Sequence, residues 1–282
     1  MMEYKILNNG LKMPVAGIGT FLLAPDEAES ACLSALENYY RLIDTANAYV
    51  NEKAVGRALQ KSGIPRGEIF LETKLWPSFY EQPDAVEKTL ERLETDYIDL
   101  LLLHQPTGNY IVGYRLLEKA YKSGKVKSIG LTNFNEDQLQ EILSICEVKP
   151  ALLQTEVHPY FQEKALKVIL TKEDIAMQAW YPLGHGDKEL LQESLFAKLA
   201  QKYGKSSVQI ILRWHIEDGN IVISGSKNPS HIRDNLVLFD FSLTSDEMEE
   251  IAALDKQKRY YTSTPEKLKQ YAEMVPLVNE QK

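Results

Sequence analysis

The chain has 282 residues, of which 44% are hydrophobic and 26% charged, a composition typical of a soluble globular protein. Its net charge of −8 argues against a nucleic-acid or anionic-membrane partner, because the basic surface that both require is missing. Residues 1–10 contain no apolar signal segment, and no apolar run is long enough to cross a membrane. We therefore expect a cytoplasmic protein that binds neither nucleic acid nor membrane.

The cysteines and histidines predict no disulfide and no metal site. Cys32 and Cys146 lie far apart in amphipathic helical patterns and lack CxxC spacing, so we expect buried free thiols. His158 and His185 are isolated in sequence, so they do not form a recognisable metal-binding motif.

The first elements in the chain predict a hairpin and then a strand. Residues 4–14 contain two short strands around Asn8-Asn9-Gly10, and we expect a type I′ turn because Asn and Gly tolerate positive φ. This hairpin should plug one end of the fold. Pro25-Asp26 then begins a helix that places Cys32, Leu36 and either Tyr39 or Tyr40 on one face.

Apolar strands then alternate with amphipathic helices along the chain. Eight strands are predicted, at Val15–Thr20, Leu42–Asp44, Ile69–Lys74, Ile98–His104, Ser128–Thr132, Ala151–Glu156, Ile175–Trp180 and Asn220–Ser224. Strands buried on both faces and joined by helices form parallel sheets, and eight such units favour a closed (β/α)8 TIM barrel. No linker divides the chain, so we interpret residues 1–282 as one domain.

Two longer segments have predicted helices of their own. The crossover from Gly184 to Gly219 should contain a helix near Leu190–Tyr203 and another near Ser206–Glu217. Thr264-Pro265 should cap a last short helix in a polar C-terminal tail.

Two glycine-containing stretches resemble nucleotide-binding motifs but fail on detail. Gly17-x-Gly19 lacks the third glycine of a Rossmann motif, because position 22 is Leu. Gly204-Lys205-Ser206 lacks the first glycine of a phosphate-binding P-loop, because position 199 is Leu and a helix precedes it. We reject both interpretations.

Ionisable residues end three consecutive predicted strands. Asp44, Lys74 and His104 end the second, third and fourth strands, and Tyr49 lies on the loop after the second. Active sites of αβ barrels are built from such strand ends. A nearby ammonium can lower a tyrosine pKa from about 10 by roughly three units before desolvation opposes it.

These four side chains suit proton transfer to a carbonyl group. Asp44 would keep Lys74 protonated and oriented, Lys74 would tune Tyr49, and a neutral His104 could hydrogen-bond a carbonyl oxygen. The arrangement lacks the nucleophile of covalent catalysis and the paired carboxylates of a glycosidase.

The tetrad and its surroundings resemble the aldo-keto reductase family. The matching stretches cover nearly the whole chain except the tail: Gly17-Ile18-Gly19-Thr20-Phe21, Asp44-Thr45-Ala46, Lys74-Leu75-Trp76, Ile129-Gly130-Leu131-Thr132-Asn133-Phe134, Gln154-Thr155-Glu156-Val157-His158-Pro159 and Ala179-Trp180-Tyr181-Pro182-Leu183-Gly184. The resemblance implies reduction of aldehydes or ketones by hydride transfer from a nicotinamide cofactor that lies across the barrel mouth. It also implies that Asp44, Tyr49, Lys74 and His104 are catalytic.

The resemblance further implies a set of cofactor-binding residues. Thr132, which stands where the family usually has Ser, would hydrogen-bond the nicotinamide carboxamide together with Asn133 and Gln154, and Trp180 would stack on the ring. The remaining cofactor-binding residues are expected to be Gly19, Thr20, Asp44, Tyr181, Leu183, Ser226, Lys227, His231 and Asn235.

Departures from the family pattern bear on cofactor choice. Gly225 and His231 stand where the family usually has Lys and Arg at the 2′-phosphate of NADP, and Lys227 can compensate. Asn228 should cap a helix that begins at Pro229 and turns its amides toward an anion. We expect NADP(H) to be favoured, with NAD(H) possible.

Other departures bear on the substrate. Phe21 and Gln105 stand where many relatives have Trp, and with Trp76 they should line a pocket for a smaller or more polar carbonyl compound. The loop after His104 is short, so the lid should come from Pro182 to Leu190 and from the tail with Tyr260, Tyr261, Tyr271 and Met274.

The sequence therefore predicts a monomeric or weakly associating barrel that acts on a small carbonyl compound. A cofactor-binding regulatory or structural barrel with little turnover is the alternative, since one fold can host different functions. A third interpretation is an enzyme for a phosphorylated metabolite, with Ser226 and the helix after Asn228 as its phosphate site.

Overall fold

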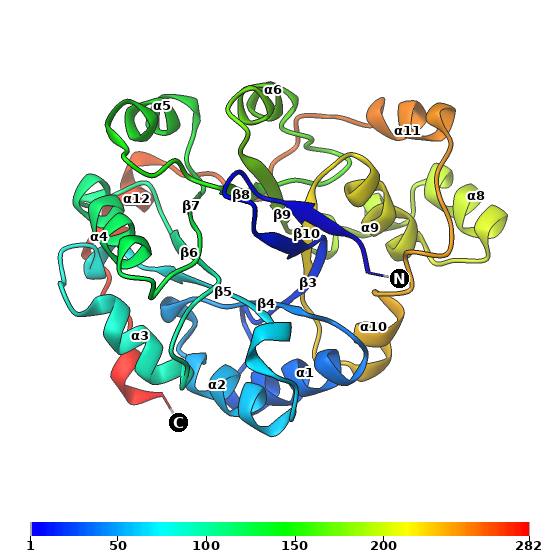
Figure 1. Cartoon of the computed structure of the whole chain (residues 1–282). Helices are drawn as coiled ribbons and strands as arrows, with labels where there is room; N and C mark the ends of the chain where they lie inside the picture. The colour runs from blue at the N-terminus through cyan, green and yellow to red at the C-terminus, as the bar shows by residue number, and fades with distance from the viewer. Residues whose placement is uncertain (1, 282) are drawn as a thin grey trace.

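The computed structural model describes residues 2–281 and shows a closed barrel of eight parallel strands surrounded by helices (Figure 1). The strands follow the order β10-β3-β4-β5-β6-β7-β8-β9 around the barrel. Their bounds are β3 Ala16–Gly19, β4 Leu42–Asp44, β5 Phe70–Leu75, β6 Leu100–Leu103, β7 Ile129–Thr132, β8 Leu152–Glu156, β9 Ala176–Trp180 and β10 Ile221–Ser224. Each overlaps its predicted range, so the predicted (β/α)8 barrel is confirmed.

The strands are apolar on both faces because each face is covered. In β6, Leu100 and Leu102 belong to a cluster inside the barrel, whereas Leu101 and Leu103 pack in the layer beneath the helices. This alternation follows from the two-residue period of a strand and makes both layers part of the core.

The surrounding helices complete the eight units. Their bounds are α1 Pro25–Glu37, α2 Glu52–Lys61, α3 Ala85–Leu93, α4 Tyr110–Lys122, α5 Glu136–Ile145, α6 Lys164–Lys172, α7 Lys188–Leu191, α8 Ser194–Tyr203, α9 Ser207–Glu217, α10 Pro229–Asp234, α11 Ser245–Ala252 and α12 Pro265–Glu273. Short 3₁₀ turns lie at η1 Asn47–Tyr49, η2 Arg66–Glu68, η3 Pro77–Phe79, η4 Gly184–Gly186 and η5 Val278–Glu280. None of the helices among residues 2–281 is long and apolar enough to span a bilayer.

The long crossover differs from the prediction in one respect. The helix expected near Leu190–Tyr203 is two helices, α7 and α8, because the backbone of Glu193 (φ −53°, ψ 132°) leaves the helical region between them. The helix expected at Ser206–Glu217 is confirmed as α9, and Ser206 caps it by accepting a hydrogen bond from the amide of Gln209. Thr264 caps α12 in the same way, as predicted.

The N-terminal hairpin closes one end of the barrel. Strands β1 Tyr4–Ile6 and β2 Lys12–Pro14 pair antiparallel, and Leu7 and Met13 pack into the cluster inside the barrel. The predicted type I′ turn is wrong, because Gly10 has a positive φ of 84° while Asn8 and Asn9 do not. The Gly10 amide donates to Leu7 O, so the loop is a type I turn followed by a left-handed glycine.

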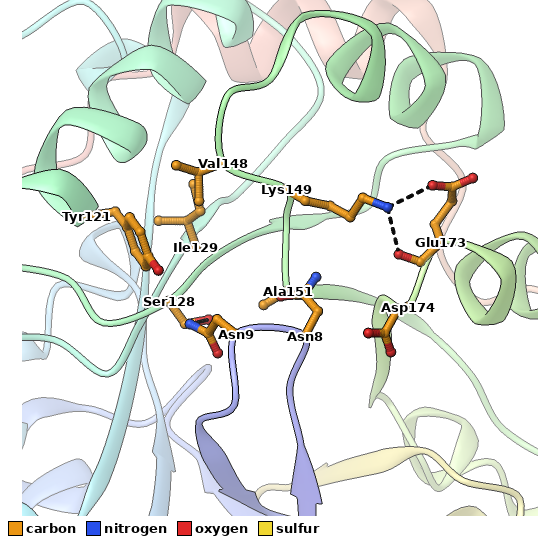
Figure 2. A pocket seen from close by; sticks show the side chains of 10 residues that line it. All are labelled: Asn8, Asn9, Tyr121, Ser128, Ile129, Val148, Lys149, Ala151, Glu173 and Asp174. Atoms are coloured by element: carbon orange, nitrogen blue, oxygen red, sulfur yellow. Dashed lines mark hydrogen bonds and ion pairs between the residues drawn. The ribbon is translucent and has the colours of Figure 1, made fainter.

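A shallow pocket of about 340 Å³ lies beside this hairpin, at the amino-terminal ends of the strands (Figure 2). Asn8 donates to Pro150 O at 2.9 Å, which fastens the hairpin to the barrel wall. Lys149 already pairs with Glu173 at 3.0 Å. The polar Asn8 side chain at this end of the barrel therefore attaches the hairpin to the barrel.

The predicted face of α1 is buried against the barrel. Cys32, Leu36 and Tyr40 are buried, whereas Tyr39 has a left-handed backbone and is 77% exposed. Both cysteines are free, as predicted, but Cys146 is only partly buried because it stands at the C-terminal end of α5.

Candidate active site

The barrel brings three of the four predicted catalytic residues, Asp44, Tyr49 and His104, to the wall of one cavity of about 810 Å³, and the fourth, Lys74, contacts two of them. Asp44 ends β4, Lys74 is the penultimate residue of β5, and His104 directly follows β6. Tyr49 lies in the 3₁₀ turn η1, five residues after Asp44. The carboxyl ends of neighbouring parallel strands meet at one edge, which is why these side chains converge.

A buried lysine connects two of these side chains. The Lys74 ammonium is ion-paired with the Asp44 carboxylate and donates to Thr45 O at 2.9 Å. Its third contact is the Tyr49 hydroxyl, at 3.4 Å. The Lys74 side chain is fully buried and does not line the cavity itself, so it acts on the cavity through Tyr49 and Asp44.

His104 lies on the other side of Tyr49. The two ring centres are 5.5 Å apart in an edge-on arrangement, and Trp76 packs edge-on against His104 at 5.0 Å. Nδ1 of His104 is buried and has no hydrogen-bond partner among the described residues. The ring is therefore held by packing and retains free hydrogen-bonding capacity.

Burial dominates the protonation states of the site. It raises the pKa of Tyr49 to about 12, although the Lys74 charge acts in the opposite direction. The lowering that the Lys74 charge alone would cause is therefore outweighed by burial. Burial opposes the charge of Lys74, but Asp44 and other neighbours outweigh it and raise the pKa of Lys74 above its usual value. Burial, and then the Lys74 charge, hold the pKa of His104 well below its usual range, so His104 is neutral.

A second carboxyl group, not anticipated from the sequence, lies beside the Asp44–Lys74 pair. Glu72 is fully buried and pairs with Asp44 in the register of β4 and β5. Gln178 donates to both Glu72 oxygens, at 2.8 and 3.0 Å, and Gln154 connects Gln178 to Asp44. Burial and then the neighbouring Asp44 raise the pKa of Glu72 well above its usual value. Polar residues at two strand positions, Glu72 and Gln178, were the available sequence signal.

Most of the predicted site residues line the cavity. Those that do are Gly19, Phe21, Asp44, Tyr49, Trp76, His104, Gln105, Thr132, Asn133, Gln154, Trp180, Tyr181, Leu183 and Ser226. Those that do not are Thr20, Lys74, Lys227, His231 and Asn235. The Thr20 hydroxyl is buried and bonded to Thr45 Oγ1 at 2.9 Å, so it braces the loop after β4.

The three residues expected at a nicotinamide carboxamide differ in their availability. Thr132 Oγ1 is buried in the cavity wall and has no hydrogen-bond partner within residues 2–281. Asn133 accepts from the Trp180 indole at 3.0 Å, and Gln154 belongs to the network around Asp44. Of these three side chains, Thr132 therefore has the free hydroxyl, with which a carboxamide could form a hydrogen bond.

The loop after β10 leads into α10, which begins as predicted. Asn228 caps α10 by accepting from the Ser230 amide at 3.0 Å. A Cβ at Gly225 would lie 3.4 Å from Gly19 O, which is an ordinary van der Waals distance. Lys227 is ion-paired with Glu27 at 2.9 Å, and His231 is exposed on α10.

The C-terminal tail forms one wall of the cavity. Trp76 Nε1 donates to Met274 O at 3.1 Å, and Tyr271 packs edge-on against Trp76 at 5.0 Å. Tyr261 donates to the Gln105 side chain at 3.3 Å. Lys267, which sequence reasoning did not single out, lines the same wall. The tail residues expected at the mouth, together with the segment from Pro182, therefore border the cavity.

Comparison with known proteins identifies the family of this chain. Residues 16–256 match the model of the aldo/keto reductase family. The chain is 39% identical over 257 residues to the methylglyoxal reductase DkgA of Escherichia coli, covering 90% of this chain and 94% of that one. It is 40% identical over 266 residues to morphine 6-dehydrogenase of Pseudomonas putida, covering 88% and 90%. A Bombyx mori aldo-keto reductase solved in complex with NADP superimposes with a TM-score of 0.88 at 31% identity, covering 93% and 95%. The chain therefore belongs to the aldo/keto reductase family, whose members are oxidoreductases that use nicotinamide cofactors.

Proposed function

We propose that this protein reduces aldehydes or ketones to alcohols with NADPH as the preferred cofactor. The observation that carries the proposal is the buried Lys74 ammonium, which contacts both Asp44 and the Tyr49 hydroxyl at the wall of a cavity that His104 also lines. The bound cofactor would supply a hydride to the carbonyl carbon. The protein would supply the proton and the hydrogen bonds that the developing alkoxide needs.

Each of the four proposed catalytic residues would have a separate role. The Tyr49 hydroxyl is protonated at neutral pH and would donate its proton to the carbonyl oxygen. The adjacent Lys74 charge would then stabilise the resulting phenolate. Neutral His104 would donate a hydrogen bond to the same oxygen and orient it. Asp44 would hold Lys74 in place by their ion pair.

The cavity also supports binding of a nicotinamide cofactor. Thr132 offers an unpartnered buried hydroxyl, and Trp180 lines the cavity where its indole could stack on an aromatic ring. The α10 cap and Ser226 would bind the adenosine end, with Lys227 near the 2′-phosphate. The Bombyx mori relative in complex with NADP supports this choice of cofactor. Because the usual Lys and Arg are replaced by Gly225 and His231, the preference should be modest.

The substrate should be a small or polar carbonyl compound. Phe21 and Gln105 line the cavity and offer less indole surface than many relatives have. Methylglyoxal is the first substrate to test, since the Escherichia coli relative is named a methylglyoxal reductase. We further propose that the chain acts as a single-domain monomer in the cytoplasm.

Loss of reduced-nicotinamide absorbance with methylglyoxal, paired with fluorescence titration of NADPH and NADH, tests the proposal. Turnover that depends on Tyr49, together with binding of either cofactor, is expected. Tight cofactor binding without turnover of any carbonyl compound would favour the regulatory barrel. Absence of cofactor binding, with inorganic phosphate bound near Ser226, would favour an enzyme for a phosphorylated metabolite.

A further inference from the structure

Lys267 is an unpaired cation in the wall of the cavity. It lies on α12, and its ammonium is 4.4 Å from the centre of the Tyr261 ring. It forms no ion pair with any carboxylate among residues 2–281. Lys269, two residues further along α12, is ion-paired with Glu273 at 4.0 Å. A cation–π contact at a partly exposed site is weak. The ammonium therefore keeps donors available for a bound group.

A continuous series of contacts joins Lys267 to the proposed catalytic histidine on two sides. On one side, His104 packs against Trp76 at 5.0 Å, and Trp76 packs against Tyr271 at 5.0 Å. Tyr271 follows Lys267 by four residues, so both lie on one face of α12. On the other side, Lys267 lies over Tyr261, which donates to Gln105, the residue next to His104. We call this ring the substrate rim; its members are Trp76, His104, Gln105, Tyr261, Lys267 and Tyr271.

Lys267 determines the charge of the substrate rim. Of the described residues that line the cavity, Asp44 and Lys267 are the ones with ordinarily charged carboxylate or ammonium groups, and Asp44 is neutralised by Lys74. The whole chain carries a net charge of −8, which disfavours the approach of anions elsewhere. A positive group that the cavity does not neutralise would select a negatively charged part of the ligand.

We propose that Lys267 binds the carboxylate of an anionic carbonyl substrate, so that the enzyme prefers aldehydes or ketones that carry a carboxylate distant from the reacting carbonyl. The inference rests on the proposed function. The carbonyl end would lie at Tyr49 and His104, and the carboxylate end at α12. Lys267 is then a specificity-determining residue, and its effect appears in substrate binding rather than in the chemical step.

Two matched substrates test this preference. We would measure kcat/KM with para-carboxybenzaldehyde and with its uncharged methyl ester, for the unmodified protein, Lys267→Met and Lys269→Met. Lys267→Met should lower the acid-to-ester ratio by about tenfold, equivalent to about 1.4 kcal/mol, through KM for the acid. Lys267→Glu should lower the ratio further. Lys269→Met is the matched control and should leave the ratio unchanged. Added salt should reduce the preference of the unmodified protein.

A binding measurement keeps this test independent of turnover. Terephthalate, which cannot be reduced, should quench tryptophan fluorescence with a dissociation constant that rises about tenfold in Lys267→Met. If no carbonyl compound is turned over but terephthalate binding still depends on Lys267, the proposed function is wrong and the proposed anion site is supported. If Lys267→Met leaves the acid-to-ester ratio and terephthalate binding unchanged, or weakens only NADPH binding, the inference is overturned.

Discussion

The carboxylate of Glu156, the last residue of β8, accepts a hydrogen bond of 2.6 Å from the backbone amide of Tyr260. Its second oxygen accepts from the amide of Tyr261 at 2.9 Å. Glu156 is buried, and hydrogen bonds to a charged acceptor of this kind stabilise by about 1.5–3 kcal/mol each. These two bonds attach the C-terminal tail to the barrel at Tyr260 and Tyr261, where the tail begins to line the cavity.

Glu156→Gln should loosen this attachment. An amide side chain offers one acceptor oxygen and places an NH₂ donor against the other backbone amide, so the local cost should be about 2–3 kcal/mol. We expect faster hydrogen exchange across residues 258–274 and a higher KM for carbonyl substrates. The exposed Glu249→Gln on α11 serves as the control. Unchanged exchange in the tail would show that other contacts hold it.

Tyr49→Phe should abolish most carbonyl reduction. Only the hydroxyl is lost, so general-acid catalysis worth about a hundredfold to ten-thousandfold disappears while the ring remains. We expect kcat to fall by that factor and the NADPH dissociation constant to change less than about twofold. Stopped-flow reduction and fluorescence titration measure the two quantities. Near-normal turnover would remove Tyr49 from the mechanism.

Lys74→Met should impair catalysis more than Asp44→Asn. The first substitution removes the charge that stabilises the Tyr49 phenolate, and the second only weakens the hold on Lys74. We expect kcat/KM to fall by more than about a hundredfold in Lys74→Met and by a smaller factor in Asp44→Asn. Steady-state kinetics at saturating cofactor show which substitution lowers kcat/KM more. The reverse order would mean that Asp44 has a direct role in the reaction.

Much of this site could be predicted because strand ends are visible in a sequence. Asp44 and His104 each follow an apolar run, Lys74 lies one residue before the end of β5, and the barrel topology then brings the three together. The strand ranges were predictable for the same reason, since buried parallel strands are continuous apolar segments bounded by polar residues.

The rest depended on distances that a sequence does not contain. Lys267 is more than two hundred residues from Tyr49 in the sequence, and only the docking of α12 brings it to the cavity. The net pKa of Tyr49 depends on how completely the side chain is buried, and burial outweighed the Lys74 charge. The hairpin turn depended on which residue takes positive φ, and the asparagines that tolerate it did not adopt it.

Glu72→Gln should make the stability of the protein less dependent on pH. The folded-state pKa of Glu72 is raised, first by burial and then by Asp44, so folding takes up a proton above the usual carboxyl pKa. Its contribution to stability is fully present below about pH 4.5 and is lost as pH rises toward the folded pKa. Glutamine is neutral throughout; its one carbonyl oxygen can accept from Gln178, and the NH₂ group that replaces the other oxygen carries a cost that is the same at every pH.

The difference in melting temperature between Glu72→Gln and the unmodified protein should therefore grow as pH rises. It should be smallest below about pH 4.5, where Glu72 is protonated in both folded and unfolded chains. Thermal unfolding measured across this pH range provides the check. A difference that does not vary with pH would mean that Glu72 ionises in the folded protein.

Cofactor choice should depend on the ion pair between Lys227 and Glu27. The pair joins the loop after β10 to the first turn of α1. Nearby, Tyr40 Oη donates to Ile232 O at 2.9 Å and so links the segment after α1 to α10. Both side chains are substantially exposed, at 69% for Lys227 and 38% for Glu27. Water screens an exposed ion pair of this kind, so a phosphate can replace the carboxylate as the partner of Lys227.

Glu27 therefore competes with the 2′-phosphate of NADP, and its removal should sharpen the cofactor preference. We expect the unmodified protein to favour NADPH over NADH by about tenfold, or 1.4 kcal/mol. Glu27→Gln should tighten NADPH by about threefold, Lys227→Ala should weaken it by a similar factor, and His231→Arg should tighten it further. Asp26→Asn, which neutralises the neighbouring acid on α1, is the matched control. NADH binding should respond to none of these changes.

Fluorescence titration of NADPH and NADH with each variant measures these changes in binding. If neither Glu27→Gln nor His231→Arg changes the NADPH-to-NADH ratio, the adenosine end lies elsewhere, and the assignments of Ser226, Lys227 and Asn235 are wrong.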